Sequence, residues 1–356
     1  MRLHFYAGVL VAPFLLVAAL TGLLYTAVPQ VDQFLYGDKL SVARVGETTR
    51  SLAEQVTAAR AAHPEGSLTT VVVGEPDETT QVVFSQPELG DRQHTVYVDP
   101  YTAEVKGTLT TWWGSTPVTT WLDDLHRNLL LDDLGRYYSE VAASWLWVLV
   151  LGGLALWWRR QRGSRAKARR LLLPDLDASK GVRRTRGWHA ATGLWIALGL
   201  LVLSATGLTW SRYAGDNFNQ ALTLMDAHTP ELSTALPGSG SAAPAGGGHH
   251  QGASGAAGPA DLAALDTVVH AAHQNGLHGR FEIGVPADAT SAYTVTQVDN
   301  TWPVHLDRAA IDPATGAVVA RSDFADWPLL AQLSKLGVQA HMGRLFGLVN
   351  QILLAA

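Results

Sequence analysis

Apolar residues form three long runs along this chain, and polar segments separate them. Residues 3–27, 141–158 and 187–211 contain no Asp, Glu, Lys or Arg. A helix needs about 20 predominantly apolar residues to span the hydrocarbon core of a membrane, and all three runs are near or above that length. A fourth apolar run begins near His341 and is still apolar at Ala356, so we expect the natural protein to continue. The pattern predicts a polytopic α-helical membrane protein with four transmembrane helices.

Charged residues predict the orientation of these helices. Of the 26 Lys and Arg residues, 11 lie in the segment 159–186, which holds only two acids. Short basic segments next to transmembrane helices are cytoplasmic, so the N-terminus is expected there too. The segments 28–140 and 212–340 carry more acids than bases, which favours the extracytoplasmic side. The basic segment is expected to contact anionic lipid, and we predict no nucleic-acid binding.

The first helix has an alternative interpretation as a cleaved signal peptide. Its apolar run is far longer than the roughly 7–15 residues of a typical signal-peptide core, and Arg2 is the basic residue that precedes it. We therefore interpret residues 1–27 as a transmembrane helix.

The two acidic segments have the same internal pattern of elements. Each begins with a helical pattern, at 51–62 and 261–274, and continues with runs rich in β-branched residues. Each then contains the turn sequence D-P-x-T-x-x-V, which leads into a final strand. The predicted strands before the turns lie at 69–73, 80–85 and 94–98 in the first segment and at 279–284, 291–298 and 305–311 in the second.

This pattern predicts two tandem repeats, each with a small α+β domain inserted after its first helix. The first domain covers residues 28–117, and an outer interfacial segment with the second helix covers 118–158. The second covers 212–335 and contains a Gly/Ala-rich insertion at 233–260, which is predicted to be flexible. Residues 336–356 begin the fourth helix.

The first and third apolar runs share a histidine, glycine and threonine pattern. His4 is followed by Gly8 and by Thr21-Gly22, and His189 is followed at the same offsets by Gly193 and Thr206-Gly207. An 18-residue step equals five helical turns and rises about 27 Å, so each histidine shares one face of its helix with two glycines. Each helix therefore offers a ligand at its inner end and small residues at both ends.

Two further histidines, His126 and His341, precede the second and fourth helices at the predicted outer edge. The chain has no cysteine, which excludes iron–sulfur clusters, cysteine zinc sites and covalent haem attachment. Neutral imidazole is a common metal ligand, and ionisable groups at membrane depth usually mark a function. We therefore predict an inner haem between His4 and His189 and an outer haem between His126 and His341.

Ligation of iron by two histidines suits electron transfer, because both axial positions are closed to oxygen. The glycines are expected to leave room for the flat macrocycle, and arginines near the outer pair are expected to meet haem propionates. The glycines are Gly8, Gly22, Gly193 and Gly207, and the arginines are Arg127, Arg136 and Arg344. The less specific explanation is that small residues only let helices pack closely and that interfacial histidines extend toward water.

Four sequence stretches resemble the PepSY-associated transmembrane family. They are Leu-His-Phe-Tyr-Ala-Gly at 3–8, Leu-Thr-Gly at 20–22, Leu-His-Arg-Asn-Leu-Leu at 125–130 with Gly135-Arg136, and Trp-His-Ala-Ala-Thr-Gly at 188–193. The resemblance covers nearly the whole chain, and the family includes PiuB-like iron-regulated membrane proteins and di-haem ferric-siderophore reductases.

The resemblance implies two PepSY-like outer domains in a bacterial inner-membrane protein, with the four histidines as ligands of two b-type haems. It also implies that electrons cross the membrane and reduce ferric iron held by a siderophore or another chelate. The donor would be a quinol or a cytoplasmic flavin protein. Two other classes stay open: a membrane-anchored PepSY-type binding or regulatory module without redox activity, and a solute permease.

Overall fold

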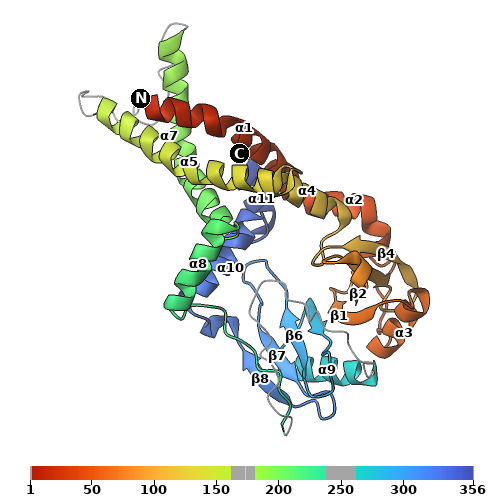
Figure 1. Cartoon of the computed structure of the whole chain (residues 1–356). Coiled ribbons are helices and arrows are strands. Elements are labelled where there is room, and N and C mark those ends of the chain that lie inside the picture. Colours follow the sequence, from red (N-terminus) through yellow and green to blue (C-terminus); the bar gives the residue numbers. More distant parts are fainter. Residues whose placement is uncertain (1, 162–172, 174–180, 238–261, 356) are drawn as a thin grey trace. The chain divides into compact units, whose positions relative to one another are not determined.

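The structure is a computed structural model that describes residues 2–161, 173, 181–237 and 262–355. Its helices and strands form two compact units, shown with their elements in Figure 1. The helical unit consists of Met1–Leu24 and Asp123–Met225, and the sheet unit consists of Tyr25–Leu122 and Asp226–Ala356. Each unit is thus assembled from both halves of the chain.

The helical unit contains three helices that are long and apolar enough to cross a membrane, and they match the three charge-free runs. They are α1 (Arg2–Thr26), α5 (Asp132–Gln161) and α7 (Val182–Leu208). Helix α4 (Pro117–Asn128) leads into α5, and α8 (Tyr213–Leu224) follows α7. No other helix in the described ranges meets the length and hydropathy of a membrane span.

The fourth predicted helix is interrupted in the structure. Helix α10 (Leu329–His341) ends at His341, and the short helix α11 (Gly347–Ala355) follows it. Gly343 between them has φ = 74°, a left-handed conformation that stops a helix and favours glycine. The prediction of one apolar helix beginning near His341 is therefore corrected to two helices joined by a turn.

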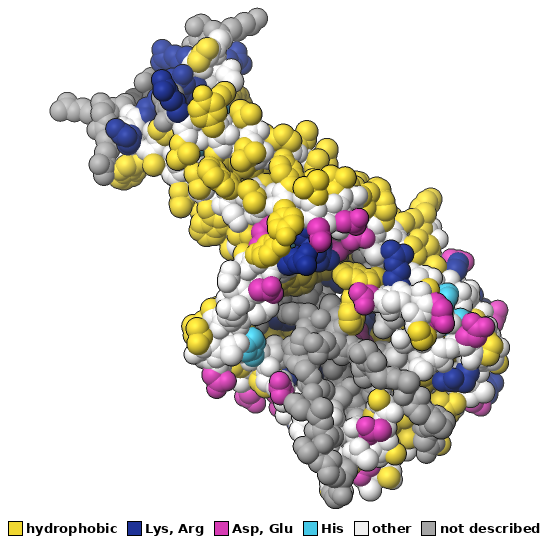
Figure 2. Space-filling view, viewed as in Figure 1, with side chains coloured by type: hydrophobic (Ala, Val, Ile, Leu, Met, Phe, Trp, Pro, Cys, Tyr) yellow, Lys and Arg dark blue, Asp and Glu magenta, His cyan; other side chains and the backbone are white. Residues whose placement is uncertain are grey.

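Helix α5 packs against both α1 and α7 within the helical unit. Val11 and Phe14 of α1 form a cluster with Ala142, and the Ser204 hydroxyl of α7 donates a hydrogen bond of 2.9 Å to the Ala143 carbonyl. Many other apolar side chains point outward, including Leu198, which is 74% exposed. Figure 2 shows these side chains covering the long helices, with Lys and Arg side chains gathered at one end. This distribution fits a lipid environment.

The sheet unit contains one antiparallel sheet of eight strands in the order β4-β3-β2-β1-β5-β6-β7-β8. The first segment contributes β1 to β4, and the second contributes β5 to β8. Strands β1 and β5 join the halves, with Val71 opposite Ile283 and Val72 opposite Glu282. The eight strands are β1 (Ser67–Val73), β2 (Thr80–Ser85), β3 (Gln93–Val98), β4 (Val105–Thr111), β5 (Phe281–Gly284), β6 (Tyr293–Gln297), β7 (Arg308–Ile311) and β8 (Val318–Ser322).

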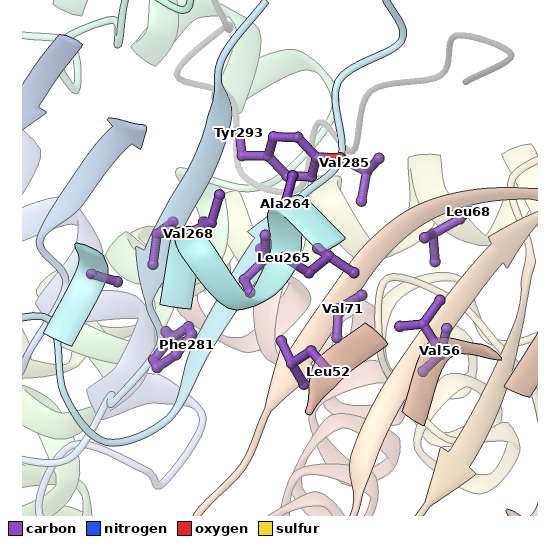
Figure 3. Packing of buried hydrophobic residues seen from close by; sticks show 14 of the residues in the cluster. Leu52, Val56, Leu68, Val71, Ala264, Leu265, Val268, Phe281, Val285 and Tyr293 are labelled. Atoms are coloured by element: carbon purple, nitrogen blue, oxygen red, sulfur yellow. The ribbon is translucent and has the colours of Figure 1, made fainter. Parts of the chain in front are cut away.

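Two helices cover one face of this sheet and share its core. Helices α3 (Leu52–Ala62) and α9 (Leu262–Gln274) lie in equivalent places in the two segments. Side chains from both helices and both sets of strands form one buried cluster, part of which is shown in Figure 3. The Asp266 carboxylate of α9 also accepts a hydrogen bond of 2.7 Å from the Leu52 backbone nitrogen, at the start of α3. The sequence predicts two separate α+β domains, whereas the structure joins the two segments around a single core.

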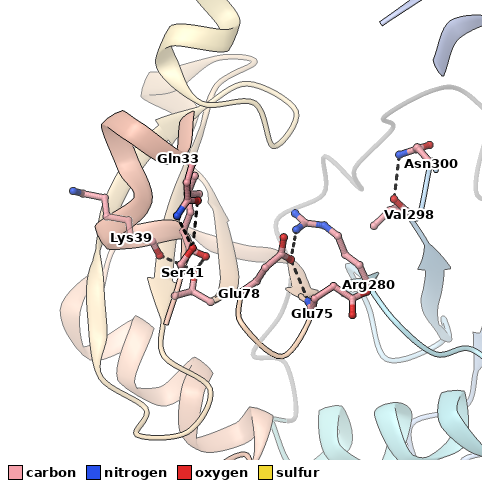
Figure 4. A network of polar contacts seen from close by, with 10 residues as sticks. Gln33, Lys39, Ser41, Glu75, Glu78, Arg280, Val298 and Asn300 are labelled. Atoms are coloured by element: carbon pink, nitrogen blue, oxygen red, sulfur yellow. Dashed lines mark hydrogen bonds and ion pairs between the residues drawn. The ribbon is translucent and has the colours of Figure 1, made fainter. Parts of the chain in front are cut away.

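Polar contacts reinforce the junction between the two segments. Arg280, just before β5, forms an ion pair with Glu78, between β1 and β2, as Figure 4 shows. The same carboxylate accepts a hydrogen bond of 3.1 Å from the Glu75 backbone nitrogen. Helix α2 (Val28–Leu40) precedes the first segment, and short 3₁₀ turns lie at Pro87–Leu89 and Phe324–Asp326.

The repeated D-P-x-T-x-x-V sequence forms the same turn in both segments. The carboxylates of Asp99 and Asp312 each accept a hydrogen bond of 2.9 Å from the backbone nitrogen two residues later. The turn then needs a left-handed residue, which is Ala103 (φ = 59°) in the first copy and Gly316 (φ = 70°) in the second. The two segments therefore contain the same turn at the same place in their sequence pattern.

The predicted flexible insertion is ordered at its start. The Leu236 nitrogen donates a hydrogen bond of 3.1 Å to the Thr290 carbonyl, and the Ala292 nitrogen donates one of 2.7 Å to the Thr234 carbonyl. Residues 233–237 are therefore paired with the chain next to β6. The remainder of the insertion and most of the basic segment 159–186 lie outside the described residues.

Candidate functional site: histidines of the helical unit

The structure brings together the two histidines of the predicted inner pair. His4 lies in the first turn of α1, and His189 lies near the start of α7. Their ring centroids are 6.2 Å apart, and their ring planes are inclined by 64°. The Nδ1 atom of His4 is buried and has no hydrogen-bond partner. One end of the helical unit therefore holds two neighbouring imidazoles in an edge-to-face arrangement.

Two glycines of α5 lie directly against the His4 ring. A Cβ atom at Gly152 would be 3.6 Å from His4 Nδ1, and one at Gly153 would be 3.2 Å from His4 Cε1. The second distance is tighter than ordinary van der Waals contact, so an alanine at this position would displace the ring or the helix by a few tenths of an ångström. Sequence reasoning missed this role, although a pair of adjacent glycines inside the apolar run 141–158 was a visible signal.

The four glycines predicted to make room for a macrocycle have different surroundings. A Cβ atom at Gly193, one turn after His189, would meet nothing within 4 Å. Gly8 packs against the Leu149 side chain, and Gly22 packs against His126. Gly207 occupies an exposed position on α7. Gly8 and Gly22 thus contact protein side chains.

His126 is held against the C-terminal part of α1. Its Nδ1 atom is 2.9 Å from the Thr21 hydroxyl oxygen, and its Cε1 atom would be 3.6 Å from a Cβ atom at Gly22. Burial lowers the pKa of His126 below its ordinary value, and the nearby Asp123 carboxylate acts in the opposite direction. Thr21 and Gly22 therefore form the part of the α1 surface against which the His126 imidazole packs.

The residues that follow His126 in the Leu-His-Arg-Asn-Leu-Leu stretch form a turn. Leu129 and Leu130 both have φ = 57°, a left-handed conformation that costs free energy for a branched side chain. The Asn128 side-chain oxygen supports this turn by accepting a hydrogen bond of 2.8 Å from the Leu130 nitrogen. A Cβ atom at Gly135 would overlap the Asn128 carbonyl oxygen, so only glycine allows α5 to start here.

The arginines predicted to meet propionates lie in different units. Arg127 forms an ion pair of 2.8 Å with Asp123, one turn earlier on α4. Arg344 lies in the sheet unit, and its backbone nitrogen donates a hydrogen bond of 2.9 Å to the Gln339 carbonyl at the end of α10. His341 is the last residue of α10 and is half-buried. Because His126 and His341 belong to different units, their predicted pairing stays a prediction.

The histidines of the sheet unit have other neighbours. His63 and His94 pack against each other with centroids 4.6 Å apart, and His273 stacks on His278 at 5.4 Å. No group of three or more His, Cys, Asp or Glu side chains is arranged to hold a metal ion in the part of the chain that the structure describes. The facing pair of His4 and His189 is the arrangement that best suits a ligand bound between two imidazoles.

Comparison with known proteins places this chain in a family. A search of curated proteins finds no match. The family model described as PepSY-associated TM region matches residues 1–356, the whole chain. The match agrees with the membrane helices, the antiparallel sheet and the four sequence stretches described above. The chain belongs to the PepSY-associated TM region family.

Proposed function

We propose that this chain is a transmembrane electron-transfer protein that binds haem between histidines and reduces ferric iron of a siderophore or another chelate. The observation that carries the proposal is the facing arrangement of His4 and His189. Two imidazoles that bind one metal ion end-on, each at about 2 Å, have ring centroids roughly 6 Å apart. The measured separation of 6.2 Å agrees with this value.

The residues around the inner pair also fit a haem. The His4 Nδ1 atom is buried without a partner, so ring rotation toward a ligand breaks no hydrogen bond in the described part of the chain. Gly193 leaves open space one turn from His189, where a flat ring system needs a small residue. Haem bound in this way supplies one-electron chemistry, because iron with two imidazole ligands exchanges electrons without binding oxygen.

The sequence repeat supports a second haem at the opposite side of the membrane, between His126 and His341. Haems near both surfaces would span most of the distance that an electron must cross. We propose that α11 begins the fourth transmembrane helix, with the basic segment in the cytoplasm of a bacterial cell and the sheet unit outside. The electron donor would be a quinol or a cytoplasmic flavin protein.

The iron chemistry follows from the preferences of the two oxidation states. Siderophores hold Fe(III) through hard oxygen donors, and the softer Fe(II) suits these ligands less well. Transfer of one electron from the reduced protein to the ferric chelate therefore weakens the complex and favours release of iron. No described side chain needs to form a bond to the substrate for this reaction.

A visible spectrum of the purified protein tests the proposal. We expect the spectrum of a low-spin haem with two histidine ligands, and dithionite should reduce it fully. Addition of a ferric hydroxamate or catecholate chelate to the reduced protein should restore the oxidised spectrum. A fully reconstituted sample without a low-spin signal would contradict the proposal.

The alternative is a membrane-anchored PepSY-type module that binds or regulates a protein partner without redox chemistry. The membrane helices and the sheet are compatible with this function as well. A variant in which His4, His126, His189 and His341 are all alanine separates the two functions. A protein that shows no ferric reduction before the change and unchanged capture of a partner protein after it would favour the binding module, whereas loss of ferric reduction would favour the reductase.

A further inference from the structure

Thr21 makes a polar contact with His126, which also has a hydrogen bond to the Ala18 backbone. The Thr21 side chain is buried on α1, with 3% of its surface exposed. Its hydroxyl oxygen is 2.9 Å from His126 Nδ1 and 2.7 Å from the Val17 carbonyl oxygen, one turn earlier on the same helix. All three residues belong to the helical unit. The hydroxyl therefore links the α1 backbone to the imidazole of α4.

The hydrogen-bond geometry selects one tautomer of the imidazole. A threonine hydroxyl has a single hydrogen, and in helices it commonly donates this hydrogen to the carbonyl four residues earlier. The shortest of these contacts joins the hydroxyl to the Val17 carbonyl at 2.7 Å, and the Ala18 carbonyl lies at 3.3 Å. With its hydrogen on either carbonyl, the hydroxyl accepts a hydrogen bond from His126 Nδ1 at 2.9 Å, and this arrangement leaves the lone pair of the neutral ring on Nε2.

Gly22, the residue after Thr21 on α1, also limits the position of the His126 ring. The Cε1 atom, which lies between the two ring nitrogens, would be 3.6 Å from a Cβ atom at Gly22. An alanine would fit there in ordinary contact, but a longer side chain would push the ring away. The Thr21 hydroxyl thus favours the His126 tautomer with the hydrogen on Nδ1. Gly22 allows the His126 ring to approach α1 closely.

We propose that Thr21 is a positioning residue that presents the Nε2 atom of His126 as a metal ligand. The inference rests on the proposed function and extends it. A partner that accepts a hydrogen bond from the second nitrogen of a ligating imidazole fixes its orientation and makes it a stronger electron donor. Removing such a partner typically weakens metal binding by about 10- to 100-fold.

Replacement of Thr21 by valine and by serine tests this role. Thr21→Val has nearly the same shape without the hydroxyl, and Thr21→Ser keeps the hydroxyl. We expect Thr21→Val to weaken binding of one haem about tenfold and to raise its midpoint potential, because the imidazole donates less charge. Thr21→Ser should restore both values. Thr57→Val is the matched control, because Thr57 makes the same bond of 2.6 Å to the carbonyl four residues earlier but has no hydrogen bond to a histidine in the described part of the chain.

A measurement without haem separates this inference from the proposed function. Nitrogen-15 NMR of the histidines in haem-free protein, assigned with His126→Ala, should find the hydrogen of His126 on Nδ1, and Thr21→Val should lose this preference. A hydrogen on Nε2 in the unaltered protein would overturn the inference even if haem binds. Equal potentials and haem affinities for Thr21→Val and the unaltered protein would also overturn it. Absence of any haem with the expected tautomer would instead overturn the proposed function.

Discussion

The histidines of the two units have the same chemistry but different surroundings. In the sheet unit, His63 packs on Phe84, with centroids 5.6 Å apart, and its Nε2 atom is 3.2 Å from the side-chain nitrogen of Gln86. The amide nitrogen can only donate, so the lone pair of His63 Nε2 is occupied. Packing and hydrogen bonding thus give the His63 ring a structural role in the sheet unit.

In the helical unit, the histidines lie beside small residues and each other. His4 contacts Gly152 and Gly153 and faces His189, and the buried Nδ1 atom of His4 has no hydrogen-bond partner. The comparison teaches that residue type alone does not identify a ligand. The Nδ1 atom of His94 in the sheet unit is also buried without a hydrogen-bond partner, but the His63 ring packs against His94 with centroids 4.6 Å apart. An imidazole is therefore a candidate ligand when its lone pair is unused and small residues also leave space in front of it.

The largest expected effect is loss of haem on removal of a ligand from the helical unit. His4→Ala or His189→Ala should remove about half of the bound haem, because each change leaves one axial ligand for the inner site. His126→Ala should remove the other half. The pyridine haemochrome assay measures the ratio of haem to protein.

The matched control for these changes is His63→Ala in the sheet unit, which should leave the haem content unchanged. Full haem content in His189→Ala, or an equal loss in His63→Ala, would remove the distinction between the two sets of histidines.

A smaller effect is expected from a side chain that displaces the His4 ring. Gly153→Leu places atoms where the His4 ring lies, since even a Cβ atom would be 3.2 Å from it. Binding of the inner haem should weaken by about tenfold, in the range found when residues that orient a metal ligand are changed. Gly199→Leu on α7 is the control, because a Cβ atom there meets nothing within 4 Å. Equal haem titrations for both variants would show that Gly153 does not set the ring position.

The smallest expected effect is a pH dependence of stability in the sheet unit. Burial, and next the neighbouring His63, lower the pKa of His94 below 6.5, and burial with His278 does the same for His273. The unfolded chain therefore binds protons at a higher pH than the folded chain. Stability should be complete well above pH 6.5 and should decrease as the pH falls below that value.

Thermal unfolding followed by circular dichroism at about pH 7.5 and about pH 5.5 measures this effect. His94→Phe keeps an aromatic ring beside Phe84 and removes one titrating group, so the decrease on acidification should be smaller. A variant that loses as much stability as the unaltered protein would assign the pH dependence to other groups.

Much of the local structure could be predicted from sequence patterns. The charge-free runs became α1, α5 and α7, and the alternating runs became strands within a few residues of their predicted bounds. Turn sequences were equally informative, because Asp99 and Asp312 form the same hydrogen bonds in both copies. The His4 and His189 pair was also predictable, since it follows from equal spacing in two repeats.

Other features could not be read from local patterns. The pairing of β1 with β5 joins strands more than 200 residues apart, and nothing in either strand specifies its partner. The break after His341 depends on Gly343, which has φ = 74° and lies between Met342 and Arg344. The positions of Gly8 and Gly22 differ from expectation because packing against Leu149 and His126 fills the space in front of them.

The sequence alone determined which segments are helices, strands and turns, because hydrophobic periodicity and turn-forming residues act over a few neighbouring positions. It also determined that histidines recur at equal spacings in two repeats. Only the tertiary structure decided that two α+β segments share one core, that Gly152 and Gly153 receive the His4 ring and that Thr21 holds His126. These contacts join surfaces from distant parts of the chain, and their fit depends on the shapes that appear only when the helices and strands pack together.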